Sequence, residues 1–213
     1  MSAQPEGRPF DFGAARLLLG SPMANDSIGV ALLVTDLLER LSIAYAVEGS
    51  LANSDYGIAR STLEAHIIAD MRPEHVAPFV SALSRDFYVD HHMIEDAISG
   101  QGTFTLVHYA TKFNVDVVIP RQRPFDQMQL QRRSAAVIST NPPRQVSVTT
   151  LEDAILSKLE RYLKGGGGTS QREWRDIVGM MQLKVSELDL VYLRHWAADL
   201  GVTALLERLL KEA

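Results

Sequence analysis

The chain has 213 residues, of which 46% are hydrophobic and 22% are charged, and its formal net charge at pH 7 is −5. These proportions are typical of a globular protein with a sizeable buried core, and the acidic balance excludes the overall cationic field that drives non-specific nucleic-acid binding. The absence of cysteine excludes disulfides, thiolate metal sites and cysteine nucleophiles. No apolar run reaches the length of about 18 residues that a membrane span requires, so we expect no membrane contact and a cytoplasmic location.

An N-terminal tail and an α/β core are predicted for the first two thirds of the chain. Residues 1–25 are rich in Gly, Pro and Ser and have no sustained hydrophobic period, which predicts a flexible tail. Residues 26–148 alternate between helical spacing and short apolar runs, which is typical of mixed α/β structure. We expect helices over residues 28–41, 51–56, 73–83, 91–98 and 124–133, and strands over residues 44–47, 63–70, 103–109, 112–119 and 145–148.

The remaining chain, residues 149–213, has helical spacing throughout and predicts a helical C-terminal subdomain. Thr150 is the expected N-cap of a helix over residues 151–164, and the glycine run that begins at Gly165 predicts a break after it. Further helices are expected over residues 171–182, 186–199 and 202–211. The predicted fold class is therefore α/β (α+β), a sheet with helices followed by a helical subdomain.

The pair Gly49-Ser50 follows the predicted strand 44–47 and precedes the predicted helix 51–56. A glycine at this position lets a phosphate approach the backbone closely, and the serine hydroxyl and free amides of a first helical turn donate to anions. Taken alone the pair is weakly specific, because many turns between a strand and a helix contain it. Its nucleotide-binding interpretation therefore depends on the neighbouring motifs.

Two strands carry side chains that could bind a metal ion. Glu64 and His66 are two residues apart on the strand 63–70, so they share one face of it, as two metal ligands must. Asp116 lies in the apolar strand 112–119, where a carboxylate is costly unless it is paired or coordinates a cation. The alternatives are a solvent-facing Glu and His, and an Asp that is hydrogen-bonded to a neighbouring loop.

Taken together, Gly49-Ser50, the Glu64/His66 pair and Asp116 resemble the nucleotidyltransferase superfamily with the DNA-polymerase-β-like core. Its pattern is Gly-Gly or Gly-Ser, then Asp-x-Asp or Asp-x-Glu, and a third carboxylate on a later strand. A closer resemblance, to bacterial AbiEii-like abortive-infection nucleotidyltransferases, covers roughly residues 28–213. It extends through Gly49–Ala52, Tyr56-Gly57, Arg60–Thr62, Leu151–Leu159, Arg172–Ile177 and Leu193–Val202.

This resemblance implies a mixed sheet flanked by helices and a cleft between the α/β core and the helical subdomain. It implies an NTP as substrate or ligand, transfer of its NMP to a hydroxyl on RNA, a protein or a small molecule, and a cognate antitoxin as a partner. Glu64, His66 and Asp116 take the catalytic positions and would bind Mg²⁺ or Mn²⁺. The implied nucleotide-binding residues are Gly49, Ser50, Arg60, Thr62 and Lys158, with Asp153 and Asp176 as supporting residues. A solvated helix face with surface ion pairs is the alternative for the last three.

The sequence departs from the family pattern, because Glu64 and His66 stand where relatives carry two aspartates. A neutral imidazole removes one negative charge, and one unit interaction at a few ångströms is worth on the order of 4 kcal/mol at an effective dielectric of 20. We therefore expect a degenerate metal site. Two functions remain open, an impaired nucleotidyl-transferring enzyme and a non-catalytic relative that binds a nucleotide or a partner protein; an assembly module is a third.

A local basic segment is the last feature of the sequence. Residues 121–144 hold five arginines against one acid, Asp126. Such a patch could hold a nucleic-acid or nucleotide acceptor, although a single aromatic, Phe125, gives little support for base stacking. A solvated surface beside a helix is the alternative.

Overall fold

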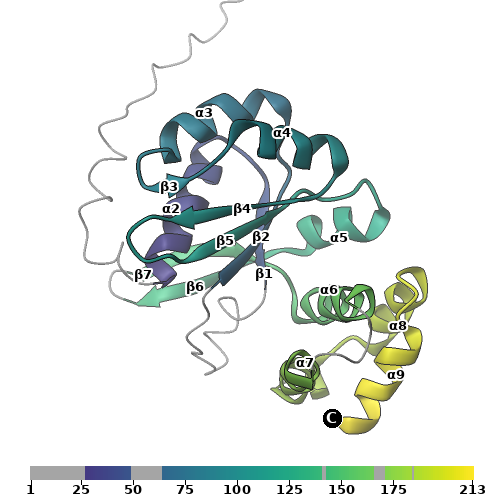
Figure 1. Ribbon diagram of the computed structural model, residues 1–213. Coiled ribbons are helices and arrows are strands. Elements are labelled where there is room, and N and C mark those ends of the chain that lie inside the picture. The colour runs from purple at the N-terminus through teal and green to yellow at the C-terminus, as the bar shows by residue number, and fades with distance from the viewer. Residues whose placement is uncertain (1–26, 49–63, 141–142, 166–170, 184) are drawn as a thin grey trace, which may run out of the picture.

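The computed structural model describes residues 27–48, 64–140, 143–165, 171–183 and 185–213. A seven-stranded mixed sheet has the order β3-β4-β5-β2-β1-β7-β6. Helices α2, α3 and α4 cover one face of the sheet, and the group α6–α9 lies on the other side (Figure 1). The strands are β1 (Tyr45–Glu48), β2 (Glu64–Ala69), β3 (Phe87–Tyr88), β4 (Thr103–His108), β5 (Asn114–Val118), β6 (Ser134–Thr140) and β7 (Pro143–Val148). The helices are α2 (Ser27–Arg40), α3 (Pro73–Leu83), α4 (His91–Gly100), α5 (Pro124–Arg132), α6 (Leu151–Lys164), α7 (Gln171–Leu183), the 3-10 turn η3 (Val185–Glu187), α8 (Leu190–Asp199) and α9 (Thr203–Glu212).

Most of the predicted elements are confirmed within a few residues, but three predictions need correction. The strands β3 and β6 were not expected: β3 has only two residues, and β6 is a seven-residue edge strand, SAAVIST, that pairs with β7 alone. The predicted helix over residues 186–199 begins only at Leu190, because the Asp189 side chain accepts a hydrogen bond from the backbone of Tyr192 and caps α8 there. The predicted helix over residues 51–56 lies outside the described residues.

The two faces of the sheet differ in character. β2 and β5 are parallel neighbours, and Ala65 and Ile67 of β2 pair with Val115 and Val117 of β5. These four side chains are buried in one hydrophobic cluster with α2, α3 and α4. Because side chains alternate along a strand, the residues between them project from the opposite face. That opposite face carries the polar residues of the two strands.

A second hydrophobic cluster lies within the helical part of the chain. It joins α6 to α7, α8 and α9, and it includes Trp174 and Trp196. Phe125 of α5 belongs to this cluster, and its ring centroid lies 5.5 Å from that of Trp196. Helix α5 therefore packs with the C-terminal helices although it precedes residue 149, and the predicted boundary at residues 148/149 stays a prediction. None of the helices among the described residues is both long and apolar enough for a membrane crossing.

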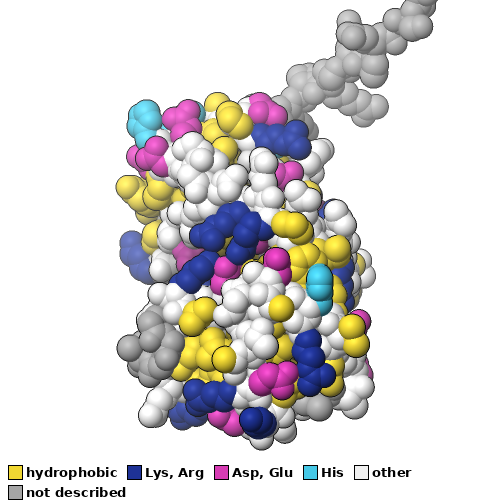
Figure 2. Space-filling view, turned by 90° about the vertical axis from the view of Figure 1, so that its right-hand side faces the viewer, with side chains coloured by type: hydrophobic (Ala, Val, Ile, Leu, Met, Phe, Trp, Pro, Cys, Tyr) yellow, Lys and Arg dark blue, Asp and Glu magenta, His cyan; other side chains and the backbone are white. Residues whose placement is uncertain are grey.

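Most of the arginines in residues 121–144 are paired, so the segment is not a free basic patch. On the side of the molecule where α5 lies, basic side chains gather at mid-height with acidic ones directly beside them (Figure 2). Arg132 lies 3.7 Å from Glu152, and Arg144 forms an ion pair with Asp36. These contacts favour the interpretation of the segment as a structural surface rather than a nucleic-acid site.

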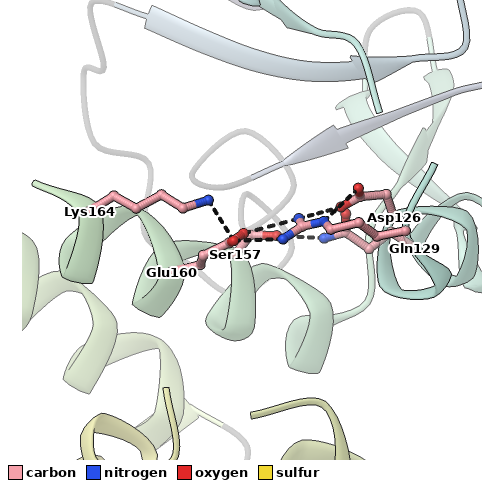
Figure 3. A network of polar contacts seen from close by, with 6 residues as sticks. Asp126, Gln129, Ser157, Glu160 and Lys164 are labelled. Carbon is pink, nitrogen blue, oxygen red and sulfur yellow. Dashed lines mark hydrogen bonds and ion pairs between the residues drawn. The ribbon is translucent and has the colours of Figure 1, made fainter. Parts of the chain in front are cut away.

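A second network of polar contacts in this segment connects α5 to α6 (Figure 3). The guanidinium of Arg123 donates to Asp126 at 2.7 Å and to Glu160 at 2.7 Å. Lys164 donates to the same Glu160 carboxylate at 2.6 Å. Burial alone would raise the pKa of Glu160, but the hydrogen bonds from Arg123 and Lys164 outweigh it and lower the pKa to about 2. The ionised form of Glu160 is therefore part of the folded structure.

This network predicts an acid sensitivity. A carboxyl group with a pKa of 4.5 in the unfolded chain and about 2 in the folded chain stabilises the fold above pH 4.5, and that contribution is lost as the pH falls toward 2. The wild type should therefore lose unfolding free energy more steeply than Glu160→Gln in this range, as measured by urea unfolding at a series of pH values. Glu207→Gln, in an exposed ion pair with Arg194, is the matched control and should keep the wild-type slope. Equal slopes for all three proteins would contradict the prediction.

Candidate metal and nucleotide site

Three of the predicted site residues meet on the face of the sheet opposite α2, α3 and α4. Glu64 and His66 project from β2, and the register of the parallel pair places His66 beside Asp116 of β5. The Nε2 atom of His66 lies 3.4 Å from Glu64 Oε1, and its Nδ1 atom lies 3.7 Å from Asp116 Oδ2. One potential ligand atom from each of the three residues lies within 4.8 Å of the others, and no other such group occurs in the described part of the chain.

The imidazole of His66 lies between two carboxylates, with one ring nitrogen facing each. A metal ion can take one nitrogen of the ring, and the second nitrogen then has a carboxylate partner that fixes the ring orientation. Asp116 is itself oriented, because Thr105 of β4 donates a hydrogen bond to its Oδ1 atom at 2.6 Å. Two carboxylates and one imidazole fit Mn²⁺ or Zn²⁺ better than Mg²⁺, which prefers oxygen ligands alone.

The neighbouring side chains of Asp116 and His66 form a polar row across the sheet, and Glu48 of β1 continues it. The sequence did not indicate Glu48 as a site residue. Glu48 pairs in register with His66 and is 3% exposed. Arg161 of α6 donates to its Oε2 atom at 2.6 Å. Burial by itself raises the pKa of Glu48, but the charge and hydrogen bond of Arg161, with smaller effects of Ser157 and His66, hold the pKa below its ordinary value. The sequence signal that could have identified Glu48 is its position: an acidic residue in an apolar strand directly before Gly49.

Lys158 lies near Glu48. It lies one turn before Arg161 on α6. Burial lowers the pKa of its ammonium group and the charge of Arg161 lowers it further, while Glu48, Asp176 and Glu173 oppose the shift. Lys158 therefore interacts electrostatically with both Glu48 and Asp176. The predicted role of Lys158 and Asp176 in nucleotide binding stays a prediction.

Asp153 has different partners. It is fully buried and accepts hydrogen bonds from the Tyr192 hydroxyl at 2.6 Å and from the Thr150 hydroxyl at 2.8 Å. The guanidinium of Arg132 lies 3.7 Å above the centre of the Tyr192 ring and 3.9 Å from the Asp153 carboxylate. These contacts join α5, α6 and α8, and none of them joins Asp153 to Glu64. Of the remaining predicted site residues, Gly49, Ser50, Arg60 and Thr62 lie outside the described residues.

The comparisons agree with the fold. No protein-family model and no curated protein matches the chain. The crystal structure of an antigenic nucleotidyltransferase-like protein from Paracoccidioides brasiliensis is similar, with a TM-score of 0.51 and 18% identity over 89% of this chain and 94% of that chain. The lincomycin-bound lincosamide antibiotic adenylyltransferase LnuA gives a TM-score of 0.46 and 14% identity over 74% of this chain and 96% of its own. The first similarity confirms the predicted fold class, and the chain has a nucleotidyltransferase-like fold.

Proposed function

We propose that the chain binds a nucleoside triphosphate and a divalent metal ion on the face of its sheet opposite α2, α3 and α4, and transfers the NMP group to a hydroxyl acceptor. The meeting of Glu64, His66 and Asp116 carries this proposal, because three ligand atoms within 4.8 Å of one another can share one ion. The oxygen and nitrogen ligands favour Mn²⁺ as that ion. The AbiEii-like subfamily remains part of the proposal.

The reaction has defined bond changes. The acceptor oxygen forms a bond to the α-phosphorus while the bond to the pyrophosphate oxygen breaks, and the hydroxyl proton passes to a carboxylate of the site. When bound, the metal ion would polarise the phosphate and lower the pKa of the attacking hydroxyl. Thr105 holds Asp116 in place through its hydrogen bond. Lys158, half-buried near Glu48, supplies a positive charge for the departing pyrophosphate.

The second candidate function is a nucleotide-binding protein without catalysis. It is favoured by His66, whose imidazole separates two carboxylates that would otherwise share a metal ion directly. An RNA acceptor has little support in either case, because most of the arginines that could hold a polyanion are already paired with carboxylates. A small-molecule or protein acceptor, or a cognate antitoxin, fits the surface charge better.

A titration separates the two candidates. Mn²⁺ and NTP together should raise the melting temperature of the wild type, since a ligand at 100 times its Kd adds about 2.7 kcal/mol to the unfolding free energy. Asp116→Ala should lose both this shift and any release of pyrophosphate. Asp96→Ala, on the exposed surface of α4, is the control and should retain both. Stabilisation without pyrophosphate release under any metal supports the non-catalytic protein. A wild type indifferent to metal and NTP contradicts both.

A further inference from the structure

Four side chains form a continuous row across the face of the sheet opposite α2, α3 and α4. Thr105 of β4 pairs with Asp116 of β5, Asp116 with His66 of β2, and His66 with Glu48 of β1. Residues that are directly paired on neighbouring strands project to the same side and have adjacent Cβ atoms. Glu48 is therefore the carboxylate next to the position where His66 replaces an acid. It lies outside the three-residue metal group, because its side chain is directed to α6.

Arg161 holds Glu48 in this position. Its Nη1 atom lies 2.6 Å from Glu48 Oε2, and among the described residues the guanidinium has no other hydrogen-bond partner. The Arg161 side chain is 42% exposed whereas the Glu48 side chain is 2% exposed, so the cation reaches solvent and the carboxylate does not. Lys158 lies three residues earlier on the same helix, and the two positive charges repel each other. One turn of α6 thus presents two cations that share the buried carboxylate.

A polyphosphate is the ligand that fits this arrangement. An arginine guanidinium binds phosphate oxygens through paired N–H donors, and lysine adds a point charge. We propose, on the basis of the proposed function, that Arg161 exchanges partners, holding Glu48 in the free protein and binding phosphates together with Lys158 in the nucleotide-bound protein. The released Glu48 then supplies the carboxylate that the metal site lacks at His66. The metal site then has three available carboxylates, Glu64, Asp116 and Glu48, instead of two.

Binding of Mn²⁺ alone, measured by calorimetry, tests the exchange. Arg161→Met keeps an unbranched aliphatic side chain and removes the guanidinium charge, so Glu48 becomes available without any nucleotide. Mn²⁺ affinity is expected to rise about ten-fold, the size of effect that partners of metal ligands have. The double variant Glu48→Gln/Arg161→Met should return to the wild-type affinity. An Arg161→Met protein that is folded by circular dichroism and binds Mn²⁺ no more tightly than the wild type overturns the proposal.

Inorganic triphosphate in the absence of metal gives an independent measurement. Glu48→Gln releases Arg161 from its partner, and triphosphate affinity should rise about ten-fold. An unchanged affinity overturns the exchange even where Arg161→Met fails to fold. Arg194→Met, which removes a 3.0 Å exposed ion pair with Glu207, is the matched control and should change neither affinity. Asp116→Asn separates the proposed metal site from the proposed exchange. If this variant leaves Mn²⁺ binding unchanged, the metal site is wrong. If it weakens Mn²⁺ binding while Arg161→Met has no effect, only the exchange is wrong.

Discussion

His66→Asp is expected to increase Mg²⁺-dependent pyrophosphate release by about 100-fold over the wild type, equivalent to roughly 2.7 kcal/mol of activation free energy. The substitution adds a negative charge between Glu64 and Asp116, and one unit interaction with a cation at this distance is worth on the order of 4 kcal/mol at an effective dielectric of 20. Part of this gain is offset, because three neighbouring carboxylates repel one another before the metal ion binds. The net effect should therefore be smaller than the full interaction.

The same substitution should change which metal ion is preferred. An aspartate offers oxygen ligands in place of the imidazole nitrogen, and oxygen ligands favour Mg²⁺. Pyrophosphate release measured in parallel with Mg²⁺ and Mn²⁺ should show a larger gain for Mg²⁺. His66→Asn has nearly the same shape as His66→Asp but no charge, so it controls for the loss of the ring. Equal activity of the two variants would mean that charge at this position does not limit the reaction.

The sequence contained enough information to predict the three-residue group but not its surroundings. Glu64 and His66 share a face because strand side chains have a period of two, and Asp116 stood out as a carboxylate in an apolar strand. That they lie close together was expected only from the resemblance to a known family, whose pattern includes a third carboxylate on a later strand; the parallel pairing of β2 and β5 comes from the structure. The role of the group in metal binding stays a prediction, since the structure shows only that the three residues meet.

Glu48 and Arg161 show why the rest could not be predicted. They are 113 residues apart, and their contact depends on the register between β1 and β2 and on how α6 packs beside the sheet. Neither quantity is encoded in a local pattern of hydrophobic residues. Helix starts are local by contrast, and Thr150 was predicted correctly because its side chain caps the backbone N–H of Asp153 three residues later.

Asp153→Ala is expected to lower the free energy of unfolding by about 3 kcal/mol, because a buried carboxylate that serves several partners is lost. The Tyr192 hydroxyl loses its acceptor, the Thr150 hydroxyl loses the acceptor of its own hydrogen bond, and Arg132 is left near a cavity. The Nη1 atom of Arg132 is buried without a hydrogen-bond partner, so the loss of the nearby negative charge adds to the cost. Urea unfolding of the variant and the wild type measures the difference.

Measuring triphosphate affinity as well as stability decides whether Asp153 supports the nucleotide site or joins the helices. The family resemblance predicts that Asp153 supports the nucleotide site, whereas its contacts join α6 to α5 and α8. If those contacts are its function, triphosphate affinity per folded molecule should match the wild type at a temperature where the variant remains folded. Tyr192→Phe removes one of the same hydrogen bonds without touching the carboxylate, so it should show a smaller loss of stability and no loss of affinity. A variant of Asp153 with wild-type stability and weakened triphosphate binding would instead place this carboxylate in the nucleotide site. The interface between the helices would then have to be stabilised by the hydrophobic contacts of α6 alone.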